Sequence, residues 1–336
     1  MRVVVTGASG FLGRLLVREL LRTRTFAAAP VTRLVLVDRV AWPDGPSARD
    51  PLVRTVEGDM IDHLGEVFAE PVDVVFHLAA AVSAECEADF DLGMRVNVDA
   101  TRALLQAARE QSASGGPVAR VLFASSIAVY GPLPTGGFPP VVSEATLPAP
   151  QSSYGTQKLM CEHLIADMTR RGFVDGRVAR LMTVAVRPGR PNAAASGFVS
   201  AILREPLAGR PTVCPVAPDL KVALASPRST IEAVLRIAEA GRGSGPGQVE
   251  GARPVNVPGL TVSVADMLAT LRRVAGAPAA DLVTLAPDPA VEAVVGSWPA
   301  DFDNRRAADL GLLPDANFEA VVRQYLAEHP GAVADH

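Results

Sequence analysis

Tyr154 and Lys158 have the residue types and the spacing for proton-transfer chemistry. They lie four residues apart in a segment predicted to be helical, and this spacing places two side chains on one face of a helix. Free tyrosine has a pKa near ~10, so it is a poor base at neutral pH. A neighbouring ammonium favours the phenolate and lowers that pKa, after which Tyr154 can take the proton of a substrate hydroxyl. The alternative is an ordinary surface pair, because this spacing is common in helices.

Two serines precede this pair and strengthen the catalytic interpretation. Ser125 and Ser126 follow a predicted strand at 120–124, at its carboxyl end. Ligands of open α/β sheets bind at that edge, where a serine hydroxyl can hydrogen-bond the reacting oxygen and orient it. Together the serines, the tyrosine and the lysine predict oxidation of an alcohol, in which the carbon-bound hydrogen leaves as hydride.

A glycine-rich segment at residues 6–13, Thr-Gly-Ala-Ser-Gly-Phe-Leu-Gly, predicts where the hydride acceptor binds. It stands between a predicted strand at 3–6 and a predicted helix at 11–23. Two of the glycines permit a tight turn and close approach of the backbone to a pyrophosphate, and the third lets the helix pack closely on the strand. Glycines also collect in ordinary turns, but the strand–turn–helix setting favours a dinucleotide site. The residues predicted to line it are Gly7, Ser9, Gly10, Phe11, Leu12 and Gly13.

Asp38 indicates which dinucleotide to expect. It ends the second predicted strand, where a carboxylate accepts hydrogen bonds from the adenosine ribose and repels a 2′-phosphate. NAD is therefore favoured over NADP, although Arg39 beside it would weaken that preference; a surface aspartate that caps a loop is the alternative.

Other parts of the cofactor also have expected contacts. Asp59 is expected to bind the adenine amine and Met60 to cover the ring. The positive nicotinamide of oxidised NAD would further favour the catalytic phenolate, and the catalytic lysine would also hold the nicotinamide ribose.

The elements that must position these side chains follow from the hydrophobic pattern of residues 1–190. Short apolar runs alternate there with amphipathic helices, which indicates a parallel sheet covered by helices on both faces. The predicted strands are 3–6, 34–38, 53–57, 72–78, 120–124 and 178–186. The predicted helices of this half are 11–23, 92–111 and 154–170.

The second half of the chain has a different pattern, with frequent prolines and glycines beyond Pro188. Helices are predicted at 197–207, 228–239, 264–275 and 318–329, and a surface loop at 241–251. We therefore predict an α/β fold, a Rossmann-type doubly wound parallel sheet with a smaller mixed α/β C-terminal lobe. Residues 1–190 are expected to form the NAD-binding domain. Residues 191–336 are expected to form mainly the substrate lobe, with some segments returning to the core sheet.

The composition argues against several other classes of protein. The 336 residues have a net charge of −4 with acidic and basic residues mixed, which argues against nucleic acid or an anionic membrane as a partner. Three widely spaced cysteines form no CxxC pair and five histidines show no HExxH spacing, so neither a disulfide framework nor a metal site is predicted. No apolar run is long enough to cross a bilayer. A reducing cytoplasm is the expected location.

Taken together, the motifs resemble the extended short-chain dehydrogenase/reductase family of NAD-dependent epimerases and dehydratases. The matching segments are TGASGFLG at 6–13, Asp38, the pair Gly58-Asp59, HLAA at 77–80, Asn97, SSIAVYG at 125–131 and YGTQK at 154–158. The resemblance implies a catalytic triad of Ser126, Tyr154 and Lys158, with Ser125 near the nicotinamide. Further cofactor contacts implied by the resemblance are Leu78, Ala79, Ala80, Asn97 and Pro188, with Asn97 packing under the site. His77 is expected to be structural, because the family uses the backbone there.

A second resemblance extends over nearly the whole chain. The segments PQSSYGTQK at 150–158, RRGFVDGR at 170–177, VRPGRPNAAASGF at 186–198, REPLAG at 204–209 and VNVPGLTVSVADML at 255–268 are similar to those of the D-erythronate dehydrogenases of four-carbon sugar-acid catabolism. This resemblance implies NAD-dependent oxidation of the C2 hydroxyl of D-erythronate to 2-oxo-D-erythronate. Met182 and Arg190 stand where proline and lysine are expected, but neither belongs to the triad.

Two alternatives compete with this function. A nucleotide-sugar epimerase or dehydratase with tightly bound NAD would share the family, but such enzymes usually hold the nucleotide with aromatic residues and an arginine. The corresponding segment here, DLKVALASPRSTIEAVL at 219–235, has no tyrosine or phenylalanine and has a lysine in place of that arginine. The other alternative is a protein that senses NAD without turnover, and the intact triad argues against it.

A small hydroxy acid needs a group that binds its carboxylate. Arg187 and Arg190 are candidates, because a guanidinium binds a carboxylate through two hydrogen bonds and both lie on the segment expected to pass the nicotinamide. Ser83 and Thr183 are candidates for binding hydroxyls, and each arginine also has an ordinary structural interpretation. The full set of predicted substrate contacts is Ser83, Ser126, Tyr154, Thr183, Arg187, Arg190 and Asn192.

The family resemblance also implies a homodimer. The helices at 92–111 and 154–170 would pair with those of a second copy in a four-helix bundle. Periodicity leaves this open, because the same apolar faces can lie inside one chain. The expected partners are therefore a small sugar acid and a second copy of the chain, with neither nucleic acid nor membrane.

Overall fold

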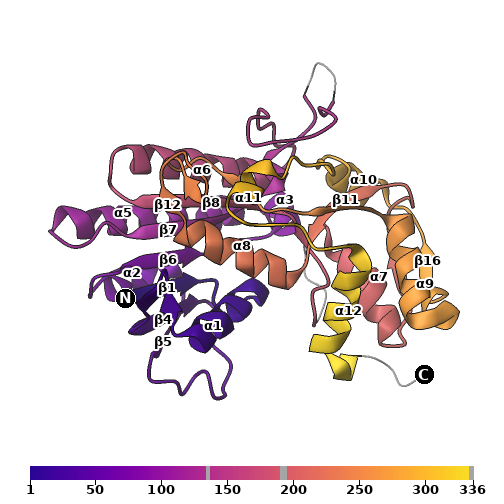
Figure 1. The fold of residues 1–336 in the computed structure, drawn as a ribbon, viewed down its shortest axis with the longest axis horizontal. Helices are drawn as coiled ribbons and strands as arrows, with labels where there is room; N and C mark the ends of the chain where they lie inside the picture. The colour runs from indigo at the N-terminus through magenta and orange to yellow at the C-terminus, as the bar shows by residue number, and fades with distance from the viewer. Residues whose placement is uncertain (134–136, 190–194, 333–336) are drawn as a thin grey trace.

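The computed structural model describes residues 1–133, 137–189 and 195–332, and its main feature is a seven-stranded parallel sheet (Figure 1). Its strands are β1 (Arg2–Thr6), β4 (Arg33–Asp38), β5 (Val53–Glu57), β6 (Val74–His77), β7 (Arg120–Ser126), β8 (Asp175–Leu181) and β14 (Val255–Asn256). They lie in the order β14-β8-β7-β6-β1-β4-β5, and the neighbouring strands pair in parallel. This is the doubly wound order of a Rossmann fold, with β1 at the switch point, and it confirms the predicted fold class.

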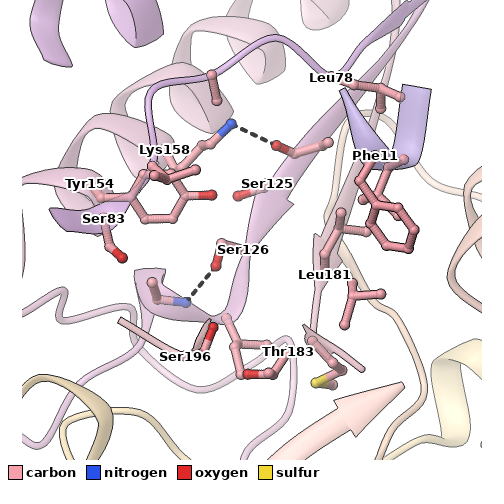
Figure 2. A pocket seen from close by; sticks show the side chains of 18 of the residues that line it. Phe11, Leu78, Ser83, Ser125, Ser126, Tyr154, Lys158, Leu181, Thr183 and Ser196 are labelled. Atoms are coloured by element: carbon pink, nitrogen blue, oxygen red, sulfur yellow. Dashed lines mark hydrogen bonds between the residues drawn. The ribbon is translucent and has the colours of Figure 1, made fainter. Parts of the chain in front are cut away.

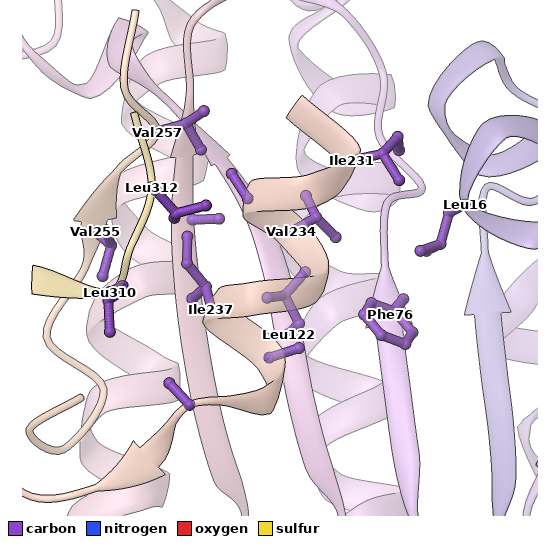
Figure 3. Packing of buried hydrophobic residues seen from close by; sticks show 14 of the residues in the cluster. Leu16, Phe76, Leu122, Ile231, Val234, Ile237, Val255, Val257, Leu310 and Leu312 are labelled. Carbon is purple, nitrogen blue, oxygen red and sulfur yellow. The ribbon is translucent and has the colours of Figure 1, made fainter. Parts of the chain in front are cut away.

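One face of the sheet is covered by helices from both halves of the chain. They are α1 (Phe11–Thr23) and α8 (Pro227–Glu239), and both agree closely with the helices predicted from periodicity. Ile231 and Val234 of α8 belong to the same buried cluster as Leu122 of β7, and Figure 3 shows this helix lying along the strands. Burial of these apolar side chains holds the C-terminal half against the sheet.

The other face is covered by α2 (Met60–Val67), α5 (Ala100–Ala113) and α6 (Ser153–Arg170). The prediction of one α-helix over 92–111 is wrong in part. Its first section is α4 (Phe90–Gly93) followed by a π-helical turn, Met94–Asp99, before α5 begins. A π turn places one extra residue in the helix, and the apolar spacing of the sequence does not reveal it.

The prediction of a single strand over 178–186 is also wrong. β8 ends at Leu181, and β9 (Thr183–Val184) pairs with β11 (Lys221–Ala225) in a separate three-stranded sheet. That sheet is completed by β15 (Leu260–Ser263). Because both strands are buried, the apolar run is nearly continuous and does not show where the chain changes sheet.

The C-terminal lobe has a hydrophobic cluster of its own, built on α7 (Gly197–Leu207), α9 (Val264–Ala280) and α12 (Phe318–Glu328). Figure 1 shows these helices together at one side of the main sheet. The helix predicted over 264–275 does end there, because Gly276 has a non-helical φ of 82° and ψ of 174°, and a separate short helical segment then runs to Ala280. The division of the chain at residue 190 stays a prediction, because residues 190–194 lie outside the described part.

Smaller elements complete the chain. They are β2 (Thr25–Phe26), β3 (Ala29–Pro30), α3 (Ser83–Ala88), a 3-10 turn at Ile127–Val129, β10 (Thr212–Cys214), β12 (Gly241–Arg242), β13 (Gln248–Val249), β16 (Val283–Leu285), α10 (Pro289–Val295), α11 (Arg305–Asp309) and a 3-10 turn at Pro330–Ala332. The segment predicted as a surface loop at 241–251 contains the short pair β12 and β13. Within the described ranges, no helix is long and apolar enough to span a membrane.

Candidate active site

The glycine loop lies between β1 and α1, directly against the chain that follows β6. Gly7 has a φ of 69°, and a Cβ atom there would lie 2.7 Å from the Ala79 amide nitrogen. A Cβ atom at Gly13 would overlap the Gly7 carbonyl oxygen. Larger residues would therefore push the loop away from both neighbours. The loop presents bare backbone, as close contact with a pyrophosphate requires.

The first turn of α1 faces the same space. Gly10 is its N-cap, and the turn contains no acidic residue. Phe11, Leu12 and Gly13 line the hollow in front of it. The amides of a first turn have no acceptor within the helix, so together with the helix dipole they attract an anion such as a pyrophosphate.

A second hollow, of about 290 Å³, adjoins the loop beside Asp38. The two carboxylate oxygens of Asp38 accept hydrogen bonds from the Ser9 amide at 2.9 Å and the Val40 amide at 3.0 Å. These bonds fix a negative charge at the end of β4, where it repels a 2′-phosphate. The bare loop, the helix end and this carboxylate together fit NAD, with the adenosine half beside Asp38 and the pyrophosphate on the loop.

Asp59 and Met60 line this adenosine hollow, as their place after the third strand predicts. Asp59 accepts a hydrogen bond from the Ile61 amide at 3.0 Å and pairs with Arg95 at 3.0 Å. Burial acts to raise the pKa of Asp59, but these two partners hold it below its usual value. Arg95 also lines the hollow, and sequence reasoning missed it because the π turn that carries it has no recognised pattern.

His77 lies under the glycine loop and is neutral. Its Nδ1 is 2.6 Å from Thr6 Oγ1 and its Nε2 is 2.9 Å from Thr101 Oγ1. Thr101 donates its own hydrogen to the Asn97 carbonyl oxygen at 2.6 Å, so Nε2 must donate to Thr101 and Nδ1 must accept from Thr6. Burial, helped by the charge of Lys158, lowers the pKa of His77 to about 3. The imidazole is a structural link between β1, β6 and α5.

This depressed pKa predicts a loss of stability in weak acid. Unfolded His77 titrates near 6.5 and the folded residue near 3, so between these values only the unfolded chain gains the proton. The free energy of unfolding is therefore unaffected above pH 6.5 and falls by up to about 1.4 kcal/mol per pH unit below it. Urea unfolding at pH 7.5 and pH 5.5 should show a loss of about 1.4 kcal/mol from this residue.

The control for this prediction is His77→Gln, in which the amide replaces the imidazole as donor and acceptor without titrating. Its unfolding free energy should be lower at both pH values, because packing is disturbed, but the change between them should be smaller than in the native protein. Equal changes in both proteins would assign the acid sensitivity to other groups.

Asn97, predicted as a cofactor contact, is buried beneath the site. Its Oδ1 accepts from the Ala81 amide at 2.8 Å, and its Nδ2 donates to Gln157 Oε1 at 2.8 Å. Gln157 directly precedes Lys158 on α6. Asn97 thus ties the chain that follows β6 to the catalytic helix, and the structure gives it this supporting place under the site.

Ser126, Tyr154 and Lys158 lie together around a hollow of about 330 Å³ at the carboxyl end of β7 (Figure 2). Ser126 ends the strand, and the other two come from the first turns of α6. The N-cap of that helix is Ser152, whose Oγ accepts from the Gly155 amide at 3.1 Å. Ser126 is among the groups that act to lower the pKa of Tyr154. The predicted spacing does bring the three side chains to one place.

In the protein alone the pKa of Tyr154 is raised, and the predicted lowering, which includes the charge of an oxidised nicotinamide, stays a prediction. Burial raises the pKa of Tyr154 to about 12, and the neighbouring Ser126 and the charge of Arg187 oppose this only in part. Lys158 Nζ donates to the Ala124 carbonyl oxygen at 2.9 Å and lies 5.6 Å from the centre of the Tyr154 ring. The ammonium is thus held by the strand, and the positive charge of an oxidised nicotinamide would add to that of Lys158 in favouring the phenolate.

A buried ion pair beneath the site fixes Ser125. Its hydroxyl donates to Glu162 Oε1 at 2.5 Å, and Arg180 of β8 binds the two Glu162 oxygens at 2.9 Å and 2.5 Å. Arg180 also donates to the Tyr130 hydroxyl at 2.6 Å. Burial lowers the pKa of Lys158 to about 8, and Glu162 is among the groups that oppose this. Sequence reasoning missed Glu162, although its place one turn after Lys158 on the same helix was a usable signal.

The hollow around Tyr154 is also lined by three of the predicted substrate residues, Ser83, Thr183 and Arg187. Two further residues, Ser196 and Trp298, line it from the lobe. Ser196 ends a run of small residues in the sequence, which indicates close approach of a compact ligand, whereas nothing in the local sequence marks Trp298, which reaches the site only through the tertiary fold. The hollow combines an anion-binding group with several hydroxyls, which suits a small polar acid.

The remaining predicted residues divide into three groups. Leu78 and Ala80 line both hollows and Ala79 lines the adenosine hollow. Pro188 instead lines a neighbouring hollow between α1 and α12. Arg190 and Asn192 lie outside the described residues. In the part of the chain that is described, no group of three or more His, Cys, Asp or Glu side chains is placed to hold a metal ion.

A doubly wound sheet with a bare glycine loop, an acidic residue at the second strand and a Ser-Tyr-Lys set defines a nicotinamide-dependent enzyme. The chain belongs to the NAD dependent epimerase/dehydratase family, whose model matches residues 3–247, and its cofactor is NAD. The family predicted from the motifs is thereby confirmed.

Two curated relatives and one solved structure are similar to this chain over nearly its whole length. The chain is 49% identical over 335 residues to the D-erythronate dehydrogenase of Cupriavidus necator, with 98% of each chain covered. It is 40% identical to the D-erythronate dehydrogenase of Haemophilus influenzae, with 97% of this chain and 99% of the relative covered. A solved nucleoside-diphosphate-sugar epimerase from Agrobacterium tumefaciens is 37% identical with a TM-score of 0.89, over 99% of this chain and 95% of that one. The second predicted resemblance is confirmed as well.

Proposed function

We propose that the chain oxidises the C2 hydroxyl of D-erythronate to 2-oxo-D-erythronate, with NAD as the hydride acceptor. Two relatives that span nearly the whole chain carry the name D-erythronate dehydrogenase, which supports this substrate. The observation that carries the proposal is the presence of Arg187 in the same hollow as Ser126 and Tyr154. An anion-binding group beside the base selects a hydroxyl that is close to a carboxylate.

Each of four side chains has a separate role in the proposed reaction. Tyr154 Oη accepts the proton of the C2 hydroxyl while the C2–H bond breaks, and C2 and its oxygen become a carbonyl. Bound NAD supplies the acceptor for the hydride at nicotinamide C4. Ser126 holds the reacting oxygen, and Lys158, fixed by the Ala124 carbonyl, supplies positive charge beside the phenolate. Arg187 binds the carboxylate and so decides which hydroxyl faces Tyr154.

The size of the hollow favours a compact substrate. Its volume of about 330 Å³ extends from the glycine loop to the catalytic residues, so the nicotinamide half of NAD shares it with the substrate. Met182 and Trp298 form apolar parts of its wall. The space beside the nicotinamide therefore suits a four-carbon acid better than a nucleotide sugar.

The direct test is to mix the protein with NAD+ and each stereoisomer of erythronate and threonate and to follow NADH by its absorbance. NADH should form with D-erythronate and form more slowly with the other acids. No NADH above background with any of the four would refute the proposal.

One other function has a specific observation in its favour, which is the epimerase name of the Agrobacterium relative. An epimerase returns its hydride to the sugar, so it gives no net NADH. Thermal shift with UDP-sugars against four-carbon acids separates the two functions. Stabilisation by a UDP-sugar alone, without net NADH from any acid, would favour the epimerase.

We also propose a homodimer through α5 and α6. Met160 on α6 is 43% exposed, an unusual position for a large apolar side chain, and Thr156 and His163 are exposed on the same side of the helix. Burial of this surface in a four-helix bundle would remove Met160 from water. Light scattering should give twice the chain mass of 35.1 kDa for the native protein, and Met160→Glu should give the single chain mass.

The matched control for the dimer is Val213→Glu, because Val213 is a 54% exposed apolar residue of the lobe. This variant should keep the native mass. A native protein with the mass of one chain, or a Met160→Glu protein that stays a dimer, would contradict the proposed interface.

A reducing cytoplasm remains the proposed location. Its support is the thiol state of Cys86, Cys161 and Cys214, which are buried and unpaired. Free buried thiols are typical of proteins that fold in reducing surroundings.

A further inference from the structure

The backbone amide and the backbone carbonyl of Arg187 each form a hydrogen bond with a side chain of α7. The Arg187 amide donates to Ser200 Oγ at 3.0 Å, and Arg204 Nη1 donates to the Arg187 carbonyl oxygen at 2.9 Å. Ser200 is 1% exposed and Arg204 is 4% exposed, so water has little access to replace either bond. Two buried side chains of one helix therefore hold the residue that lines the hollow beside Tyr154.

The carboxylate that pairs with Arg204 has a second cationic partner at the surface. Its guanidinium pairs with Glu205 at 2.7 Å, and Glu205 accepts a second hydrogen bond from Arg210 at 2.7 Å. Glu205 consequently keeps a cationic partner when Arg204 is replaced. This arrangement allows Arg204 to be tested without leaving a carboxylate unpaired.

The charge of Arg204 also acts directly on Arg187. Burial and the nearby charge of Arg204 together lower the pKa of Arg187. Two cations at this place repel each other, and a bound anion relieves the repulsion. The amino end of α7 adds to the positive potential, since its N-cap Ser196 lines the same hollow.

We propose that Ser200 and Arg204 are positioning residues, which fix Arg187 in the orientation that binds a carboxylate. The helix α7 thereby restricts the reaction to hydroxy acids. This inference rests on the proposed function, because it takes Arg187 as the carboxylate anchor. Both residues act through Arg187, and their effect should appear in the binding of the acid.

The test compares Arg204→Met and Ser200→Ala with Arg210→Met. The last is a matched control, because Arg210 binds the same Glu205 but its side chain is 59% exposed. Arg204→Met should raise KM for D-erythronate by about tenfold to a hundredfold, the effect of one lost hydrogen bond to a charged group, and leave KM for NAD+ unchanged. Ser200→Ala should give a smaller rise of the same kind, and Arg210→Met should change neither constant.

A double variant separates positioning from a general loss of structure. If Arg204 acts through Arg187, Arg187→Met/Arg204→Met should have the same kcat/KM as Arg187→Met alone. Erythritol, with CH2OH in place of the carboxylate, should be oxidised equally poorly by the native enzyme and by Arg204→Met. Additive losses in the double variant, or an equal rise of KM for NAD+, would mean that Arg204 only stabilises the fold and would overturn the inference.

Failure of this inference can be distinguished from failure of the proposed function. If the native enzyme oxidises D-erythronate and Arg204→Met behaves like Arg210→Met, the positioning role is wrong and the proposed function stands. If the native enzyme oxidises none of the four-carbon acids, the proposed function is wrong and the inference falls with it.

Discussion

Replacing Tyr154 with phenylalanine is expected to lower kcat with D-erythronate by about 10²–10⁴-fold, the size of a general acid–base contribution. The ring remains in place, and the only group lost is the hydroxyl that lines the hollow together with Ser126. KM for NAD+ should stay close to the native value, because the glycine loop and Asp38 are untouched. Steady-state kinetics with each substrate varied in turn measures both constants.

The same substitution at Tyr325 is the matched control, because this residue lies on α12 in the lobe. Tyr325→Phe should turn over at the native rate. A Tyr154→Phe enzyme that also keeps the native rate would show that another group takes the proton from the C2 hydroxyl.

The second large effect is expected at Arg187, where methionine should lower kcat/KM for D-erythronate by about 30-fold or more through KM. Removing one partner of a buried charge pair costs about 2–5 kcal/mol of binding free energy. The lower value corresponds to the roughly 30-fold fall in kcat/KM. Methionine keeps the length and apolar packing of the arginine stem but removes its charge and its hydrogen bonds. KM for NAD+ is the internal reference and should not change.

Arg187→Lys is the informative partner variant. It keeps the positive charge but loses the planar pair of donors, so its KM should lie between those of the native enzyme and Arg187→Met. Added guanidinium ion should restore part of the activity of Arg187→Met. A fall in kcat with an unchanged KM for the acid would instead indicate that a different residue binds the carboxylate.

The parts of the site that the sequence predicts correctly are those that depend on spacing within one or two adjacent elements. Gly7 and Gly13 fit their loop because the turn between a strand and the next helix is local. Tyr154 and Lys158 share a helix face for the same reason, and Ser126 follows from the end of its strand. Parallel strands end at one edge of the sheet, so these separate local patterns meet in space.

The parts that could not be predicted depend on distant contacts or on burial. Glu162 and Arg180 are 18 residues apart on a helix and a strand, and their pairing appears only once α6 is packed on the sheet. The π turn around Asn97 keeps an apolar pattern much like that of an α-helix. The raised pKa of Tyr154 results from burial of its side chain. The four-residue spacing between Tyr154 and Lys158 does not indicate that burial.

The covering of the main sheet by α8 has a consequence for how the protein is made. Ile231 of α8, Val255 of β14 and Leu310 belong to the cluster that also buries Leu122 of β7. A nascent chain that has emerged only to residue 190 therefore carries every strand of the sheet except β14, with an apolar face still open to water. The segments that contain Ile231, Val255 and Leu310 are synthesised later, so this face is buried only after they emerge from the ribosome. A truncation between Trp298 and Leu310 would thus impair cofactor binding, although it removes no residue that lines the cofactor hollows.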